Sequence, residues 1–276
     1  MIRERAIPTS VSAMPKGSRE PVYAPVVRVA LGLFRALDVD FAITGTENVP
    51  ATGGGVVVMN HTGYLDFALA GVPYWKARKR LVRFMAKDQV FKNPVSGPLM
   101  RGMKHIPVDR TAGADAYAAA VDALRRGELV GVFPEATISR SFCLKEFKSG
   151  AARMAAEAGV PLYPVVLWGS QRIWTKGRKR SLHSNRHVPV SITLGPPLTA
   201  EPGEAADVTT KRLVEAMQGM LDAAVAAYPE RPAGPEDQWW MPEHLGGSAP
   251  TREQAAAMDA EEAAARLAAK QQKAAS

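Results

Sequence analysis

Short apolar runs alternate with longer stretches of helical character along most of the chain. Seven of the short runs are rich in branched apolar residues and carry little charge, so we predict β-strands there. These runs lie at residues 41–44, 56–59, 81–86, 105–110, 129–133, 162–168 and 188–194. Three stretches with helical spacing or high alanine content predict helices, at residues 112–126, 148–158 and 207–228. A helix over residues 67–74 is expected to end at Pro73, and residues 91–102 allow at most a short helix.

Alternating buried strands and helices are typical of an α/β fold. We therefore predict a single domain, residues 39–228, with a mostly parallel or mixed sheet covered by helices on both faces. Residues 1–20 lack periodicity and the long apolar region of a secretory signal, which favours a flexible arm. Residues 229–276 form a C-terminal tail rich in Pro and Ala, expected to be partly helical or disordered. Within it, the Trp239-Trp240 pair either docks back on the domain or sits at a membrane.

Residues 21–38 form an apolar segment that contains Arg28 and Arg35. Its length is near the lower limit for crossing a bilayer, and a charge in mid-span is costly. An N-terminal amphipathic helix that lies in the membrane interface can leave both arginines among the headgroups. We predict a helix that lies on the membrane surface or packs on the domain, with an ordinary core helix as the alternative and a true membrane span as the least favoured reading.

The net charge of +8 is unevenly distributed. Residues 229–276 hold eight acidic and five basic residues, so the first 228 residues carry about +11. This favours acidic partners such as phosphate esters or anionic lipid. Basic stretches with tryptophan at residues 75–80 and 169–180 suit lipid headgroups or the phosphates of coenzyme A, or are simply solvated. No nucleic-acid motif is present, so no nucleic acid is expected.

Cysteine and histidine spacing restricts the chemistry further. The single cysteine, Cys143, excludes an intramolecular disulfide, and a base for it as a nucleophile is not evident. No spacing indicates metal ligands, so no metal site is predicted. His105 is expected to have a packing role.

Three predicted strands end in polar residues. One is followed by His61, with Asp66 five residues later; one ends at Asp109-Arg110; one is followed by Glu135 and Thr137. Ligands of such sheets gather beyond the carboxyl ends of the strands. If these strands are parallel neighbours, a His-Asp pair, an Arg and a Glu meet at one edge, which suits removal of a proton from a hydroxyl beside a phosphate.

Four blocks in this order resemble the glycerolipid acyltransferase family, which includes 1-acylglycerol-3-phosphate acyltransferases. Residues 60–66 fit the family's NHxxxxD block, and residues 102–110 resemble the second block, which ends in a phosphate-binding Arg. Residues 133–139 resemble the FPEGTRS block, and residues 160–165 resemble a fourth block with two prolines. The resemblance covers about residues 45–200. In the third block, Ala136 replaces the family Gly and Ile138 replaces the family Arg.

The resemblance implies roles for the site residues. His61 would be the general base toward the acceptor hydroxyl, and Asp66 would orient it. Arg110 and Arg140 would share the acceptor phosphate, since Ile138 has replaced the usual Arg. The remaining residues expected at the acceptor site are Glu135, Thr137 and Lys148, and Lys145 is within reach of the same place.

The resemblance also implies the partners. We expect acyl-CoA as co-substrate, or an acyl carrier protein as donor, and no cofactor. The acceptor would be a lysophospholipid or glycerol-phosphate, most simply lysophosphatidic acid, which would become phosphatidic acid. The protein is expected to be peripheral or monotopic on the cytoplasmic face of the cell membrane, bound to an anionic surface. Two alternatives remain: another acceptor, such as glycerol-3-phosphate, a glycolipid or an aminolipid, and a non-catalytic basic module that binds membranes or RNA.

Overall fold

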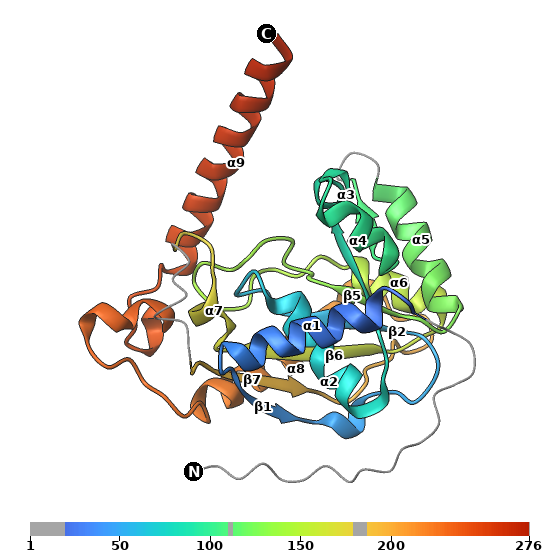
Figure 1. Ribbon diagram of the computed structural model, residues 1–276, viewed down its shortest axis with the longest axis horizontal. Coiled ribbons are helices and arrows are strands. Elements are labelled where there is room, and N and C mark those ends of the chain that lie inside the picture. Colours follow the sequence, from blue (N-terminus) through green and yellow to red (C-terminus); the bar gives the residue numbers. More distant parts are fainter. Residues whose placement is uncertain (1–19, 110–112, 179–186, 276) are drawn as a thin grey trace.

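A seven-stranded sheet forms the centre of the protein in the computed structural model, which describes residues 20–109, 113–178 and 187–275 (Figure 1). The strands are β1 (Asp40–Thr44), β2 (Gly55–Met59), β3 (Val82–Lys87), β4 (Ile106–Val108), β5 (Leu129–Val132), β6 (Leu162–Trp168) and β7 (Pro189–Leu194). Their order across the sheet is β1-β7-β6-β2-β5-β3-β4. All neighbours are parallel except β6 and β7. The predicted mostly parallel, mixed sheet is therefore confirmed.

The helices cover both faces of this sheet, as predicted (Figure 1). They are α1 (Tyr23–Ala36), α2 (Asp66–Arg78), α3 (Asp88–Lys92), α4 (Ser96–Gly102), α5 (Gly113–Arg125), α6 (Gly150–Ala158), α7 (Ser170–Ile173), α8 (Ala206–Ala226) and α9 (Arg252–Ala275), with short 3-10 helices at Thr46–Asn48, Pro235–Trp240 and Glu243–Leu245. Side chains alternate between the faces along β2. Val56 and Val58 join a core with α5, α6 and α8, whereas Val57 and Met59 join a second core with residues of α1 and α2.

Helix α2 does not end at Pro73, so that prediction is wrong. It continues to Arg78 and ends at Lys79, which adopts a left-handed conformation (φ 56°). Proline removes one backbone hydrogen bond from a helix. Tyr74 and Trp75, the residues just after it, are buried against the body of the protein, and this packing holds the helix together past Pro73.

Helix α1 packs one side on the domain and leaves apolar side chains exposed on the other. Tyr23 is buried and donates a hydrogen bond to the carbonyl oxygen of Val82 (2.6 Å), and Phe34 is buried near the other end. Val29 and Leu33 are 73% and 49% exposed. Within the described part of the chain, every helix is either too short or too polar to cross a membrane.

The first half of the C-terminal tail belongs to the body of the protein. Trp240 is fully buried in the core beside α8, next to Tyr228, so it docks on the domain rather than at a membrane. Helix α9 then begins against the body and extends away from it (Figure 1).

Candidate active site

The carboxyl ends of two neighbouring parallel strands bring two of the three predicted polar groups together. His61 follows β2 and Glu135 follows β5, and the backbone N–H of His61 donates to Oε1 of Glu135 (2.9 Å). Asp109 follows β4, which β5 and β3 separate from β2. Arg110, the predicted phosphate ligand, lies outside the described residues.

His61 and Asp66 form a directly bonded pair. Nδ1 of His61 is 2.9 Å from Oδ2 of Asp66, which is the first residue of α2 and fully buried. The same carboxylate oxygen accepts the backbone N–H groups of Thr62 (2.7 Å) and Gly63 (2.8 Å). Because this oxygen acts as an acceptor, His61 donates from Nδ1, and the neutral ring keeps its lone pair on Nε2. The His61 side chain is 20% exposed, so it can reach a substrate.

The turn that carries His61 is bonded at each successive backbone N–H. His61 donates to Glu135, Thr62 and Gly63 donate to Asp66, and Tyr64 donates to the carbonyl of Trp174 (2.9 Å). These four groups are therefore occupied by internal acceptors. They are therefore not available to stabilise negative charge that develops on a bound substrate.

The loop after β5 fixes the backbone of His61 from both sides. Glu135 accepts its N–H, and the N–H of Ser139 donates to its carbonyl oxygen (2.7 Å). The second oxygen of Glu135 accepts the N–H of Lys145 (3.3 Å). Burial raises the pKa of Glu135 to about 8, against the lowering effect of these N–H groups. Glu135 is thus buried against the backbone of the His61 turn, where it positions His61. It does not lie at an exposed acceptor surface.

One aromatic side chain stacks on the histidine, and two others close to it in sequence are exposed. The ring of Phe133 stacks on the ring of His61, with centroids 4.1 Å apart and planes inclined by 24°. Tyr64 packs on Trp174 (4.6 Å between centroids) and remains 41% exposed, as does Phe67 on α2. The imidazole therefore has one apolar face.

Three cations from the loops after β5 and α7 face helix α9. Arg140 and Lys145 come from the loop after β5, and Lys176 follows α7. Nζ of Lys145 donates to Oγ1 of Thr137 (2.8 Å), and all three cations pair with carboxylates of α9. Thr137 Oγ1 (3.5 Å) and Arg140 Nε (3.2 Å) both contact the carboxylate of Asp259. Lys148 is exposed, and its backbone N–H donates to the carbonyl of Pro134 (3.2 Å).

The two departures in the third block have distinct structural settings. Ala136 takes a left-handed conformation (φ 62°), which glycine adopts at little cost and alanine does not. Ile138 is only 5% exposed, so it replaces an arginine with a buried apolar group.

Two of these contacts were not predicted from the sequence. Lys176 was assigned only to a general basic stretch, and the tail that contains α9 was expected to be partly helical or disordered. A usable signal was present: Asp259 and Glu262 are three residues apart, hence on one face of a helix, in an acidic tail attached to a strongly basic domain. Elsewhere in the basic stretches, Arg80 donates to the carbonyls of Gly53 (2.7 Å) and Gly127 (2.9 Å), so it joins two loops.

Residues 40–168 match the protein family described as Acyltransferase. The chain is 29% identical to the 1-acyl-sn-glycerol-3-phosphate acyltransferase of Bacillus subtilis over 158 residues, 55% of this chain and 75% of that protein. It is 32% identical to the chloroplast enzyme LPAT1 of Arabidopsis thaliana over 152 residues, 53% of this chain but only 41% of the plant protein. The crystal structure of the LPA acyltransferase PlsC from Thermotoga maritima shares the fold, with a TM-score of 0.58, 22% identity, and coverage of 75% of this chain and 81% of that one.

Proposed function

We propose that this chain, whose residues 40–168 match the Acyltransferase family, acylates 1-acylglycerol-3-phosphate to form phosphatidic acid. It is an O-acyltransferase, and the proposed donor is acyl-CoA, with an acyl carrier protein thioester as the other source. The observation that carries the proposal is the His61–Asp66 pair at the end of β2, with Nε2 of His61 available as a base.

The proposed reaction is a direct transfer. Nε2 of His61 takes the proton of the acceptor hydroxyl while the hydroxyl oxygen attacks the thioester carbonyl carbon. The buried carboxylate of Asp66 stabilises the imidazolium that forms. When the tetrahedral intermediate breaks its C–S bond, the thiolate leaves and takes the proton back from His61. The thioester is already activated, so the proposed route uses no cofactor and no acyl-enzyme.

Thiol release from acyl-CoA with a panel of acceptors tests this function. We expect release that depends on 1-acylglycerol-3-phosphate and falls by about 10²- to 10⁴-fold in His61→Ala, the usual contribution of a general base. Release with only a glycolipid, an aminolipid or glycerol-3-phosphate would replace the acceptor. No release with any acceptor, together with unchanged membrane binding by His61→Ala, would indicate a binding module instead.

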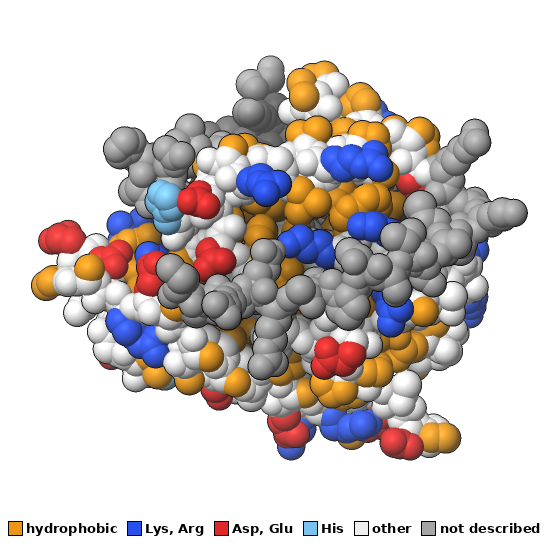
Figure 2. Space-filling model, turned by 60° about the horizontal axis from the view of Figure 1, so that its bottom comes forward, with side chains coloured by type: hydrophobic (Ala, Val, Ile, Leu, Met, Phe, Trp, Pro, Cys, Tyr) orange, Lys and Arg blue, Asp and Glu red, His pale blue; other side chains and the backbone are white. Residues whose placement is uncertain are grey.

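We also propose that the protein works as a peripheral protein on the cytoplasmic face of the cell membrane, where its lipid acceptor lies. Val29 and Leu33 of α1 are exposed, and so are the flanking Arg28 and Arg35. Figure 2 shows hydrophobic side chains with Lys and Arg among them in the upper centre of the view, and Asp and Glu mainly at its left and in its lower part. Such a mixture suits an anionic surface. Co-sedimentation with anionic vesicles should fall in Val29→Glu/Leu33→Glu; equal sedimentation of this variant and the wild type would contradict attachment through α1.

A further inference from the structure

Asp259 and Glu262 of α9 neutralise the cation cluster of Arg140, Lys145 and Lys176. Asp259 contacts Nζ of Lys145 (2.6 Å), Nζ of Lys176 (2.7 Å) and Nε of Arg140 (3.2 Å). Glu262 contacts Nζ of Lys176 (2.6 Å) and Nη2 of Arg140 (3.0 Å). Three cations thus converge on two carboxylates from a single helical face.

The cluster is largely screened from solvent by these contacts. The side chains of Arg140 and Lys176 are 12% and 13% exposed, and that of Lys145 is 31% exposed. Burial raises the pKa of Asp259, but the hydrogen bonds from Lys145 and Lys176 outweigh it and lower the pKa to about 2. The Asp259 carboxyl that the three cations contact is therefore ionised at physiological pH.

This anion site is directly coupled to the catalytic turn. Arg140 follows Ser139, whose N–H bonds the carbonyl of His61, and the backbone N–H of Lys145 bonds Glu135, which accepts the N–H of His61. The loop that supplies two of the three cations is thus the loop that fixes the proposed base. A phosphate held by the cluster would therefore contact the same loop that fixes the backbone of His61.

The two carboxylates match a phosphate monoester in charge. Together they carry two negative charges, and a phosphate monoester carries about −1.5 to −2 near neutral pH. Both present several oxygens to a planar guanidinium and two ammonium groups, the donors that proteins use for phosphate. Glu262 also pairs with Arg266 of α9, but the two carboxylates offer the cluster negative oxygens of the kind that a bound substrate phosphate would supply.

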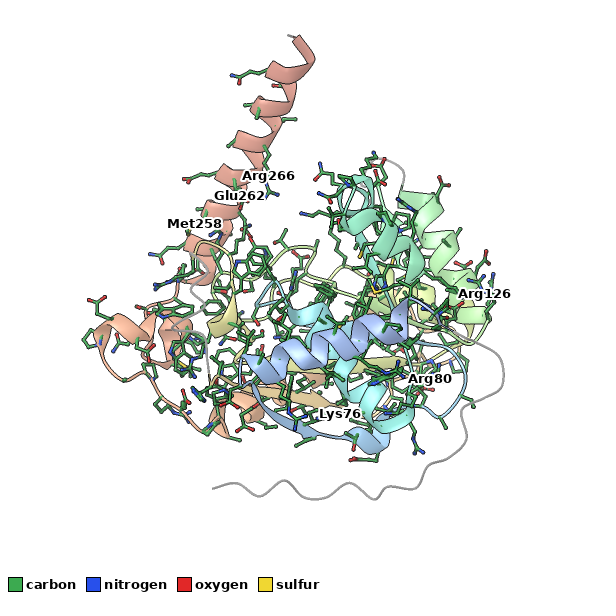
Figure 3. All side chains as sticks on the ribbon, in the orientation of Figure 1. Lys76, Arg80, Arg126, Met258, Glu262 and Arg266 are labelled. Atoms are coloured by element: carbon green, nitrogen blue, oxygen red, sulfur yellow. The ribbon has the colours of Figure 1, made fainter. Side chains whose placement is uncertain are left out.

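Few apolar contacts compete to keep α9 in place. Of its side chains that the structure describes, Ala255 is buried, whereas Met258 and Leu267 are 40% and 58% exposed. Figure 3 shows Glu262 on the part of α9 beside the body, with Arg266 farther along the helix as it extends away. Ion pairs near a surface are weakened by salt and competing ions, so an incoming phosphate can displace the helix.

We propose that Arg140, Lys145 and Lys176 bind the phosphate of the acceptor, and that Asp259 and Glu262 occupy this site as an internal competitor until the acceptor displaces α9. The inference rests on the proposed function for the identity of the substrate. It adds a regulatory role to a tail that has no part in the chemistry.

The test compares two full-length variants with equal charge change on the same helix. Asp259→Asn/Glu262→Gln removes the competing carboxylates. Glu253→Gln/Glu261→Gln removes two exposed carboxylates of α9 that take no part in the described ion pairs of the cluster, and it serves as the control. We expect the first variant to lower the acceptor KM at least about five-fold, a typical coupling between sites. The kcat and the KM for acyl-CoA should match those of the control.

A binding measurement keeps the inference testable without turnover. Calorimetric titration with glycerol 3-phosphate should give at least about a five-fold lower Kd for Asp259→Asn/Glu262→Gln than for the control, and a higher Kd for Lys176→Met. Equal Kd values would overturn the inference even if acyl transfer occurs. Absence of acyl transfer in every protein would overturn the proposed function while this titration still decides on the site. A decrease in the KM for acyl-CoA alone would assign the cluster to the donor and overturn the acceptor assignment.

A single substitution tests the inference if the double variant does not fold. Glu262 is 28% exposed, so Glu262→Gln is expected to fold and to lower the Kd for glycerol 3-phosphate in the same direction by a smaller factor. An unchanged or higher Kd in this variant would contradict competition by α9.

Discussion

Asp66 holds the His61 ring at 2.9 Å through the same oxygen that accepts the N–H groups of Thr62 and Gly63. One buried atom thereby sets the shape of the turn and the tautomer of the histidine. The shape depends on an acceptor oxygen, whereas stabilisation of the imidazolium depends on negative charge. These two contributions can be separated by substitution.

Asp66→Asn should preserve the fold and remove most of the activity. The amide oxygen can still accept the backbone N–H groups, but the neutral side chain does not stabilise the imidazolium. We expect kcat to fall by about 10²- to 10⁴-fold. Steady-state kinetics and a thermal melt would check this. A kcat within two-fold of wild type would remove Asp66 from the mechanism.

Glu135→Gln should impair catalysis by displacing His61. Glutamine offers one oxygen where Glu135 uses two, so an amide N–H would face either His61 N–H or Lys145 N–H. An unpaired buried donor costs about 1–3 kcal/mol of stability. We expect kcat to decrease about ten-fold or more, because small misplacements of a catalytic group are costly, with substrate KM values nearly unchanged. A large change in acceptor KM at constant kcat would instead favour the acceptor-site role first expected for Glu135.

The sequence predicted the sheet well because its strands are buried and its helices amphipathic. Val56 to Met59 lie at the centre of the sheet, where no other structure satisfies so apolar a run. Polar residues at the ends of β2 and β5 were predicted, and the observed pairing of these two strands brings His61 and Glu135 together. The direction in which the Glu135 carboxylate points was not predictable, since it depends on backbone groups of the His61 turn.

Contacts made by the tail were less predictable. Local pattern identifies α9 as a helix but does not show which surface its charged face meets. The persistence of α2 beyond Pro73 depends likewise on burial of Tyr74 and Trp75 by distant elements. Tertiary packing determines both the surface that α9 meets and the length of α2, and local propensity does not predict either.

Ala136→Gly should stabilise the protein. Ala136 has φ 62°, where a side chain costs energy that glycine avoids, so we expect a gain of about 0.5–1 kcal/mol in the free energy of unfolding. The matched control is Ala119→Gly on the exposed face of α5, where loss of helix propensity should cost about 1 kcal/mol. Urea denaturation measures both. Destabilisation by Ala136→Gly would show that the methyl group makes contacts that outweigh the backbone cost.

His105 should make stability depend on pH. Its buried Nδ1 accepts the backbone N–H of Phe84 (3.0 Å), and burial, with Arg83 nearby, lowers its pKa to about 4. Between pH 6.5 and 4 the unfolded histidine binds a proton that the folded one does not, so stability falls as pH decreases, by about 1.4 kcal/mol per unit for this group.

The variant His105→Asn keeps an acceptor oxygen but does not titrate. Its free energy of unfolding should therefore vary less with pH than that of the wild type across this range, as measured by urea denaturation at pH 7, 5.5 and 4.5. Parallel curves for the two proteins would exclude His105 as the source of the slope.

Asn60 extends the central sheet beyond the end of its strand. Its amide donates to the carbonyl of Leu167 (2.9 Å) and its oxygen accepts the N–H of the same residue (2.8 Å), across 107 positions of sequence. The residue before His61 is thus fixed by β6, a strand that is distant from it in the sequence. Contacts of such long separation form slowly, because loop closure precedes them. Recovery of enzymatic activity during refolding should therefore follow the joining of β2 to β6, and lag behind helix formation seen by circular dichroism.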